Sequence, residues 1–448
     1  MRIGILGGGL VGLVIASRCS RHQCEILELD DKVGGHCRSL AQDGYTFDLG
    51  GPHILFSRNK PILELMYRQL EDNVAQRRRN NRIWYDGRFV KYPFENGLYD
   101  LAPQDRFECL YHYLKNDHPK PANFKEWIYH VFGDGIAEKY MIPYNEKIWN
   151  VPAEEMAIDW VEGRVPRPPV EDVMKSAVGV ETEGYTHQLY FGYPKIGGIE
   201  ALPLSFAKDC RYPITTGFRV QRVWREAGCW NVTDGQRIRS YDALVSTIPI
   251  QDLIDALPDV PAYVSDAVRD LRYNSLIVVM IGAVGSALPC TALYVPDPSL
   301  LFHRLSFPQS FTEHGAPPGH MAITAEITTN PGDGIHELGD DDVLRKVVAG
   351  LETMGLLRAA DLRFSRIHRT KHAYVVRTFD YSDKLKLALD YLNGLGIISA
   401  GRNAEFEYIN MDEAVRRGLE VAKALDARCS AGPQRNLEDC GPGSKQAR

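Results

Sequence analysis

A glycine-rich turn close to the N-terminus carries the clearest chemistry in the chain. Gly7-Gly8-Gly9-Leu10-Val11-Gly12 matches the spacing G-x-G-x-x-G. The first glycine permits a tight bend, the second lets the backbone approach a pyrophosphate, and the third lets a helix pack on a strand. The N–H groups at the start of that helix then face the phosphates. The pattern predicts that Gly7, Gly9 and Gly12 bind a dinucleotide.

An acidic residue extends this pattern. Glu28 lies sixteen residues beyond Gly12, at the end of a β-prone run. A carboxylate in that place can accept hydrogen bonds from ribose hydroxyls. The pair therefore favours dinucleotide binding over the alternative, a glycine-rich turn with a purely structural role.

The elements that must position these residues follow from the periodicity of the apolar side chains. Strands at 2–6 and 25–29 and a helix at 13–21 make a βαβ unit around the turn. The other predicted elements are a hairpin at 82–92, helices between 104 and 160, strands within 212–250 and 268–330, a buried strand at 276–284, a last strand at 395–400 and a helix at 411–425. This order predicts a nucleotide domain assembled from separated parts of the chain.

Composition limits the kind of protein this can be. The 448 residues are 44% hydrophobic and 25% charged, with a net charge of −6, which excludes wholesale disorder and gives no global attraction to nucleic acid. Nine cysteines without a C-x-x-C pair predict reduced thiols in the cytoplasm and no metal site. The apolar runs at 3–16 and 276–284 match neither a signal peptide nor a membrane span, so no membrane insertion is expected.

A second glycine pair, Gly34-Gly35, follows Glu28 and leads into His36-Cys37-Arg38-Ser39. Here the sequence resembles flavoproteins of the amine oxidase and glutathione reductase type, whose second glycine pair marks FAD. The resemblance implies that Gly34 and Gly35 belong to the cofactor site and that Arg38 contacts the pyrophosphate. A surface arginine is the alternative for Arg38.

Motifs further along resemble the UDP-galactopyranose mutase family in order and spacing, the eukaryotic branch most of all. They are Lys91-Tyr92-Pro93-Phe94-Glu95, Pro143-Tyr144-Asn145-Glu146-Lys147-Ile148-Trp149, Gly163-Arg164-Val165, Tyr193-Pro194 with Gly197-Gly198, Phe302-His303-Arg304, and Gly401-Arg402 with Tyr408. The resemblance covers residues 1–425. It implies a mutase that interconverts the pyranose and furanose forms of a nucleotide-diphosphate sugar, in which N5 of reduced FAD attacks the anomeric carbon.

The resemblance also implies roles for single residues. His53 matches a histidine whose loop lies against the flavin ring, and Asp412 lies near the flavin at the start of the last helix. His53, Arg164, Arg304 and Arg402 are implied in catalysis, with His53 and Arg402 also in cofactor binding. The residues implied in substrate binding are Tyr92, Phe94, Glu95, Asn145, Trp149, Arg164, Tyr190, Tyr294, Arg304, Tyr374, Arg402 and Tyr408.

The diphosphate assignments make physical sense without the resemblance. Arg304, Arg402, Tyr374 and Tyr408 are the implied diphosphate ligands, and a chain of net charge −6 needs such local guanidinium and phenol donors to bind an anion. The alternative for each arginine is a structural ion pair. For Trp149 and Phe94 the alternative is the hydrophobic core.

One residue departs from the family pattern. Glu95 stands where the mutases carry an amide, and a carboxylate can only accept hydrogen bonds. A guanine edge offers two donors, whereas uracil would set its O4 lone pairs against the carboxylate. The substitution predicts a nucleotide other than UDP.

The resemblance implies an α/β fold: an FAD-binding Rossmann-like domain with a helical insertion and an antiparallel β-sheet domain. The expected parts are 1–80 with 196–265 and 385–425 for FAD, 98–160 for the insertion, 81–97 with 161–195 and 266–384 for the β-rich part, and a disordered tail at 426–448. NADPH or NADH is a candidate reductant, and a homo-oligomer is a further expectation.

Two other functions remain open from the sequence. An FAD oxidase or desaturase of the amine oxidase or protoporphyrinogen oxidase type fits Arg38-Ser39. Such an enzyme needs an apolar substrate tunnel, and the arginines at 164, 304 and 402 argue against one. A non-catalytic FAD protein is the third hypothesis.

Overall fold

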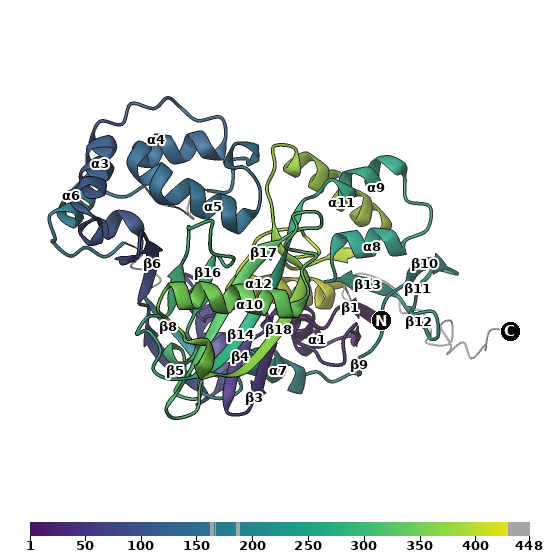
Figure 1. The fold of residues 1–448 in the computed structure, drawn as a ribbon. Helices are drawn as coiled ribbons and strands as arrows, with labels where there is room; N and C mark the ends of the chain where they lie inside the picture. The colour runs from purple at the N-terminus through teal and green to yellow at the C-terminus, as the bar shows by residue number, and fades with distance from the viewer. Residues whose placement is uncertain (162–164, 166, 185–188, 429–448) are drawn as a thin grey trace.

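A parallel five-stranded sheet forms one half of the molecule (Figure 1). The computed structural model describes residues 1–161, 165, 167–184 and 189–428. The strands, in sheet order, are β19 (Ile398–Ser399), β13 (Ala243–Ser246), β1 (Arg2–Leu6), β2 (Gln23–Leu27) and β9 (Ile214–Thr215). They come from three distant parts of the chain, so separated segments build this one sheet.

Helices and a small sheet cover this parallel sheet. One apolar core joins it to α1 (Leu10–Arg18), α7 (Ala201–Lys208) and α12 (Met411–Arg428). A second core joins it to β10 (Arg222–Glu226), β11 (Cys229–Thr233), β12 (Ile238–Tyr241), α8 (Ile250–Ala256), α9 (Ala262–Arg269) and α11 (Tyr381–Leu395). The parallel strands are therefore buried on both faces, as their short, continuous apolar runs require.

A larger seven-stranded sheet forms the second half. Its strands, in order, are β18 (Leu362–Val375), β14 (Tyr273–Val284), β17 (His320–Thr329), β16 (Arg304–Ser306), β15 (Ala292–Tyr294), β6 (Asn81–Tyr85) and β7 (Arg88–Lys91). All neighbours are antiparallel except β15 and β6. On one face of β14, Ile277 and Val279 pack in the core that includes α10 (Asp340–Thr353). On the other face, Leu276 and Val278 pack in the core shared with the helices between residues 103 and 177. The strand predicted at 276–284 is thus confirmed, and both of its faces are buried.

The helical part lies at one end of the molecule, above the edge of the large sheet (Figure 1). It consists of α3 (Pro103–Leu114), α4 (Phe124–Ile136), a π-helical turn at Ala137–Met141, α5 (Ile142–Trp149) and α6 (Val170–Ala177). Asn123 caps α4, because its Oδ1 accepts a hydrogen bond from Glu126 N at 2.9 Å. The helical periodicity predicted between 104 and 160 is confirmed.

Smaller elements complete the fold. They are α2 (Lys60–Leu70) and two antiparallel pairs, β3 (Ser39–Gln42) with β4 (Tyr45–Asp48) and β5 (Val74–Arg78) with β8 (Tyr190–Pro194). The predicted hairpin is present as β6 and β7, with Asp86 and Gly87 in the left-handed region at φ 46° and 71°.

Three expectations need correction. The predicted strand at 395–400 is reduced to Ile398–Ser399, because Leu395 belongs to α11. The last helix continues to Arg428, so the first residues of the expected tail are helical, and 429–448 lie outside the described residues. Cys229 is disulfide-bonded, so the expectation of reduced thiols is wrong there.

None of the described helices is both long enough and apolar enough to cross a membrane.

Candidate active site

The glycine turn between β1 and α1 is tightly packed at Gly7 and Gly12 and open at Gly9. Gly7 has φ +100°, and a Cβ at Gly12 would lie 2.2 Å from Gly7 O. At Gly9, by contrast, a Cβ would meet nothing within 4 Å. Gly9 is also the N-cap of α1 and no side chain caps the helix, so its first N–H groups face this open space. The turn fits the diphosphate of a dinucleotide.

Glu28 and the second glycine pair close around this turn. Glu28 is buried at the end of β2, and its carboxylate accepts hydrogen bonds from Gly8 N at 2.6 Å and Asp30 N at 2.9 Å. Burial raises the pKa of Glu28. Gly34 N donates to Gly8 O at 2.9 Å, and Gly35 lies against Gly9. The predicted ribose and diphosphate ligands are therefore side by side.

Arg38 lies beside the same region but is already paired. Its Nη1 is 2.8 Å from Asp30 Oδ2, and its Nη2 is 3.7 Å from Asp31. Its Nε is buried and has no hydrogen-bond partner. This ion pair agrees with the structural alternative for Arg38, although the buried Nε keeps a donor for a cofactor.

The loop after β4 carries His53. Its Nδ1 lies 2.8 Å from Gly51 O, and burial together with the charges of Arg402 and Arg304 lowers the pKa of His53 to about 4. The imidazole is therefore neutral at pH 7. Asp412, at the start of α12, lies nearby in the same region of the fold, because Ser57 Oγ donates to its Oδ2 at 2.6 Å.

Arg304 on β16 forms a bidentate ion pair with Glu326 on β17. Nε donates to Oε1 at 2.6 Å and Nη2 donates to Oε2 at 2.5 Å. Glu326 is fully buried, and Gly51 lies directly against it, since a Cβ at Gly51 would come within 2.4 Å of Oε2. This pairing leaves the Nη1 edge of the guanidinium group for another acceptor.

Sequence reasoning missed Glu326. A signal was present, because Glu326 is the one charged residue in the apolar run from Met321 to Ile327 of a central strand. A charge at such a position needs a partner. The partner itself depends on the register of β16 and β17, which pairs Arg304 with Glu326.

Arg402 keeps its Nε and Nη2 donors free, whereas those of Arg304 are bound to Glu326. Its guanidinium carbon lies 4.4 Å from the ring centroid of Tyr408 and 5.4 Å from that of Tyr374. Its Nε and Nη2 are buried and have no hydrogen-bond partner. An unpaired buried guanidinium group costs free energy unless an anion occupies the space beside it.

Asn145 and Trp149 approach this arginine from α5. The Trp149 indole N–H donates to Asn145 Oδ1 at 3.3 Å, which fixes the indole along the helix. Its ring meets those of Tyr374 and Tyr408 edge to face, at centroid distances of 6.2 and 5.8 Å. The structure therefore brings together these two predicted residues, the two tyrosines and Arg402.

A row of aromatic rings extends from the arginines into the helical part. Neighbouring ring centroids are 4.7 to 5.4 Å apart in the order Tyr92, Tyr294, Tyr144, Tyr140 and Phe94. Phe94 is fully buried at the inner end, in agreement with the core alternative. Tyr144, which the sequence did not single out as a ligand, connects the row to Arg304 and Glu326.

Glu95 follows Phe94 in a short 3-10 turn, η2 (Phe94–Asn96), and is only 4% exposed. Burial raises the pKa of its carboxyl group to about 7. No lysine or arginine among the described residues forms an ion pair with it.

One predicted ligand, Tyr190, is not brought to this cluster. Tyr190 is 62% exposed at the start of β8, opposite Arg78 on β5. Arg164 lies outside the described residues.

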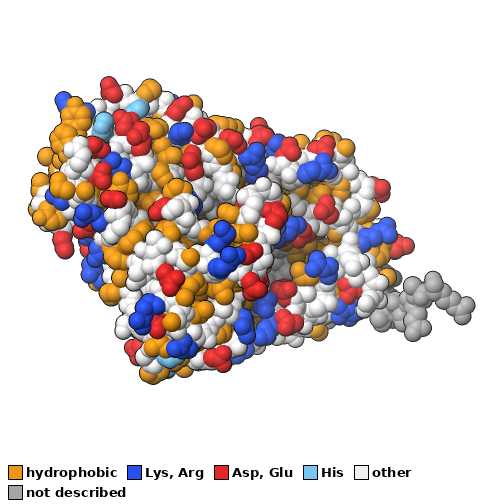
Figure 2. Space-filling model, in the orientation of Figure 1, with side chains coloured by type: hydrophobic (Ala, Val, Ile, Leu, Met, Phe, Trp, Pro, Cys, Tyr) orange, Lys and Arg blue, Asp and Glu red, His pale blue; other side chains and the backbone are white. Residues whose placement is uncertain are grey.

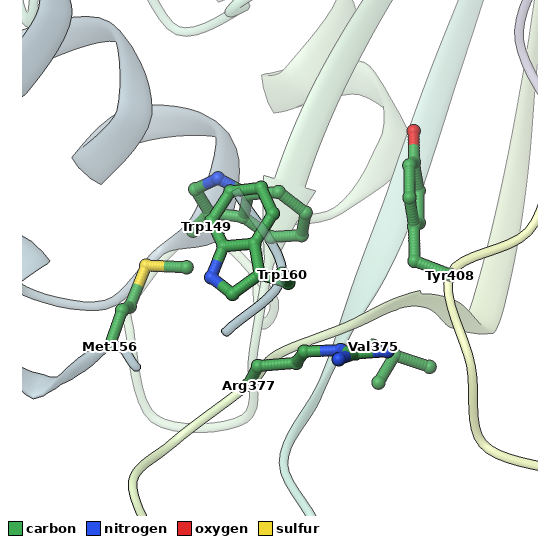
Figure 3. Close-up of a pocket in the computed structure, with 6 residues that line it drawn as sticks. All are labelled: Trp149, Met156, Trp160, Val375, Arg377 and Tyr408. Atoms are coloured by element: carbon green, nitrogen blue, oxygen red, sulfur yellow. The ribbon is translucent and has the colours of Figure 1, made fainter. Parts of the chain in front are cut away.

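A hollow opens beside Trp149 and Tyr408 (Figure 3). Its empty volume is about 220 Å³, part of it open to solvent, and its lining is mainly apolar. The close-up shows the two indoles together, with Tyr408 across the hollow and Arg377 along its floor. The lining residues are Trp149, Met156, Trp160, Val375, Arg377 and Tyr408.

The parallel sheet, the open glycine turn and the large mixed sheet define an α/β flavoprotein of the amine oxidase type. Two family models match the chain: an NAD(P)-binding Rossmann-like domain at residues 5–70 and flavin containing amine oxidoreductase at residues 173–426. The chain belongs to the flavin containing amine oxidoreductase family. The predicted fold class is thereby confirmed.

Solved structures agree on the fold. A reduced UDP-galactopyranose mutase matches with a TM-score of 0.86 and 24% identity over 98% of this chain and 96% of that one. A putative protoporphyrinogen oxidase from Exiguobacterium sp. 255-15 matches with a TM-score of 0.75 and 17% identity over 95% and 99%.

Among curated proteins, a 4,4'-diapophytoene desaturase (4,4'-diaponeurosporene-forming) of Staphylococcus aureus (strain MRSA252) is 33% identical over 112 residues. This match covers 25% of the chain but only 19% of the desaturase.

Proposed function

We propose that this chain is a flavin-dependent mutase that interconverts the pyranose and furanose forms of a nucleotide-diphosphate sugar. The observation that carries the proposal is the guanidinium group of Arg402, whose Nε and Nη2 are buried without a partner beside the rings of Tyr374 and Tyr408. Arg304 also lies near Tyr374 and keeps one edge free of its ion pair with Glu326. Two arginines and two phenols suit a diphosphate.

The protonation states support this binding mode. Burial raises the pKa of Tyr374, so its hydroxyl group stays protonated at neutral pH and can donate to a phosphate oxygen. The ion pair with Glu326 fixes the plane of the Arg304 guanidinium group before substrate arrives. His53 is neutral and adds no charge beside the two arginines. The site therefore presents a rigid set of donors to a dianion.

FAD, when bound and reduced, supplies an electron-rich ring that can act as a nucleophile. Gly7, Gly9 and Gly12 would hold its diphosphate and Glu28 its ribose, with Gly34 and Gly35 closing the turn. NADPH or NADH is the proposed reductant. The chain's own task is to orient the sugar, hold the departing diphosphate and exclude water.

We also propose that Glu95 reads the nucleobase. Its pKa of about 7 means that both protonation states are accessible at neutral pH. The carboxylate suits the two donors of guanine, whereas the protonated group can donate to O4 of uracil and accept from N3–H. We expect tighter binding of GDP than of UDP at pH 8.5, and a smaller difference at pH 6. A preference for UDP at both values contradicts this assignment.

An FAD-dependent oxidase or desaturase is the second candidate. The apolar hollow beside Trp149 favours it, as does the 33% identity of a quarter of the chain with a desaturase. The two functions are separated by supplying the oxidised protein with an amine or a porphyrinogen in air. Formation of hydrogen peroxide would favour the oxidase, and calorimetric binding of an NDP-hexose that Arg402→Ala weakens would favour the mutase.

A further inference from the structure

The outer surface of the helical part carries a stripe of exposed apolar side chains. On α3, Phe107, Tyr111 and Leu114 are 59%, 47% and 47% exposed. Their spacing of four and three residues places them on one side of the helix. The buried residues of α3, Cys109 and Tyr113, lie on the opposite side. The stripe is therefore additional to the core-facing side of this helix.

The neighbouring helix extends the stripe. Val170 and Met174 on α6 and Val178 at its C-cap recur at intervals of four residues, and α6 packs against α3. Tyr99 lies beside Gly179, just after α6. Figure 2 shows hydrophobic side chains gathered over the end of the molecule where Figure 1 places α3 and α6. We call this surface the helical apolar face; its residues are Tyr99, Phe107, Tyr111, Leu114, Val170, Met174, Val178 and Val180.

The size of the helical apolar face suits a protein interface. Aromatic side chains carry about 200 Å² each, so its three half-exposed rings alone leave about 300 Å² in water. The five aliphatic side chains roughly double this area, to the upper end of what a monomer exposes, about 300–600 Å². The total approaches the ~800 Å² that each partner buries in a stable complex.

Several charged groups around the face are paired with one another. Lys139 Nζ lies 2.9 Å from Asp105 and 2.8 Å from Glu108, and Lys175 pairs with Glu171 at 2.5 Å. No charge of one sign dominates these helices, so the face does not select a strongly charged partner. The described residues of α3 and α6 also offer no group of basic side chains for anionic lipid headgroups.

We propose that the helical apolar face is the contact between two copies of this chain, related by a twofold axis. In such an interface the same surface serves both subunits, so a neutral, apolar face is complementary to itself. Aromatic residues and methionine are enriched at the centre of interfaces. The stacked rings of Phe107 and Tyr111, with centroids 5.6 Å apart, supply such a centre.

Analytical ultracentrifugation of the full chain over a range of concentrations tests this inference. The wild type is expected to sediment as a dimer, and Phe107→Asp and Met174→Asp as monomers. Each substitution removes two contacts because of the twofold axis. Both side chains are exposed in the single subunit, so circular dichroism spectra should be unchanged. The matched control is Tyr263→Asp on α9, a 63% exposed tyrosine outside the face, which should remain dimeric.

Two results would overturn the inference. One is a wild type that stays monomeric at the highest concentration, and the other is a dimer that survives both substitutions. Cosedimentation with vesicles of phosphatidylcholine and phosphatidylserine tests membrane binding as the alternative. If the wild type is monomeric and cosediments with these vesicles, while Phe107→Asp does not, the face binds membranes and the dimer is wrong.

Discussion

The guanidinium group of Arg304 and the carboxylate of Glu326 form a bidentate ion pair across two neighbouring strands, with distances of 2.6 and 2.5 Å. Glu326 has no exposed surface, and Gly51, two residues before His53, lies against its Oε2. The pair thus joins the proposed diphosphate site to the loop that carries His53. It also determines which edge of Arg304 faces the substrate.

Replacing Glu326 with glutamine should destabilise the protein. Glu326→Gln keeps the shape of the side chain but leaves Arg304 partly buried without a counter-charge, which costs about 3 kcal/mol of unfolding free energy. Urea denaturation measures the loss. The control is Asp342→Asn, which removes an exposed partner of Arg345 and should cost less than about 1 kcal/mol. Equal effects of the two substitutions would show that the buried pair has no special structural role.

Arg402 should be required for nucleotide-sugar binding. Arg402→Ala removes charge-assisted hydrogen bonds to the diphosphate, and the dissociation constant should rise by about 30- to 100-fold, or about 2–3 kcal/mol. Arg402→Lys should recover little of this, because a lysine lacks the forked donors and their stacking on Tyr408. Isothermal titration calorimetry with an NDP-hexose checks both.

Arg304→Ala should weaken the same binding, whereas Arg366→Ala, on the exposed part of β18, should not. If neither Arg304→Ala nor Arg402→Ala changes the affinity, the diphosphate assignment is wrong.

Two glycines of the N-terminal turn should respond differently to alanine. At Gly12 the new Cβ would lie 2.2 Å from Gly7 O, so Gly12→Ala should unfold or strongly destabilise the protein. At Gly9 the backbone has φ −72° and the Cβ meets no protein atom within 4 Å. Gly9→Ala should therefore leave the stability of the cofactor-free protein unchanged and lower its flavin content. Absorbance at 450 nm and thermal melts of stripped protein distinguish these outcomes, and a full flavin content in Gly9→Ala would contradict the assignment.

The carboxyl group of Glu95 should make stability depend on pH. Its pKa rises from 4.5 in the unfolded chain to about 7 in the fold, so the folded state binds the proton more tightly. The stability that this proton contributes is complete below pH 4.5 and is lost as the pH rises through 7. Glu95→Gln removes this dependence.

At pH 8 the Glu95→Gln variant should be more stable than the wild type by about 1–3 kcal/mol, and at pH 4.5 the difference should vanish. Glu313→Gln, at an exposed glutamate, should follow the wild type at both values. If the unfolding free energies of Glu95→Gln and the wild type changed with pH in parallel, the carboxyl group would not be desolvated in the fold.

The sequence was informative where local rules decide the structure. The G-x-G-x-x-G spacing predicted an open turn at Gly9 and close packing at Gly12, and Asp86-Gly87 predicted the hairpin, because backbone sterics determine both. The order of motifs led to Arg402, Tyr374, Tyr408 and Trp149, which the structure brings together.

Contacts between residues far apart in the sequence could not be predicted in this way. The Arg304–Glu326 ion pair depends on the register between β16 and β17, and the ion pair of Arg38 with Asp30 depends on how the second glycine pair folds back. The periodicity of the apolar side chains predicted helices between 104 and 160. Residues on both sides of α3 are apolar, so periodicity alone did not show that Phe107 and Leu114 would face solvent.

A redox-neutral ring contraction needs the reduced cofactor, and an anaerobic turnover assay measures it. Dithionite-reduced and oxidised wild type are incubated separately with UDP- and GDP-hexopyranoses, and the products are separated by chromatography. We expect an NDP-furanose from the reduced protein, none from the oxidised protein, and a large loss of product in Arg402→Ala. Absence of furanose from every reduced sample, with hydrogen peroxide formed from an amine or porphyrinogen in air, would show that the chain is not a mutase.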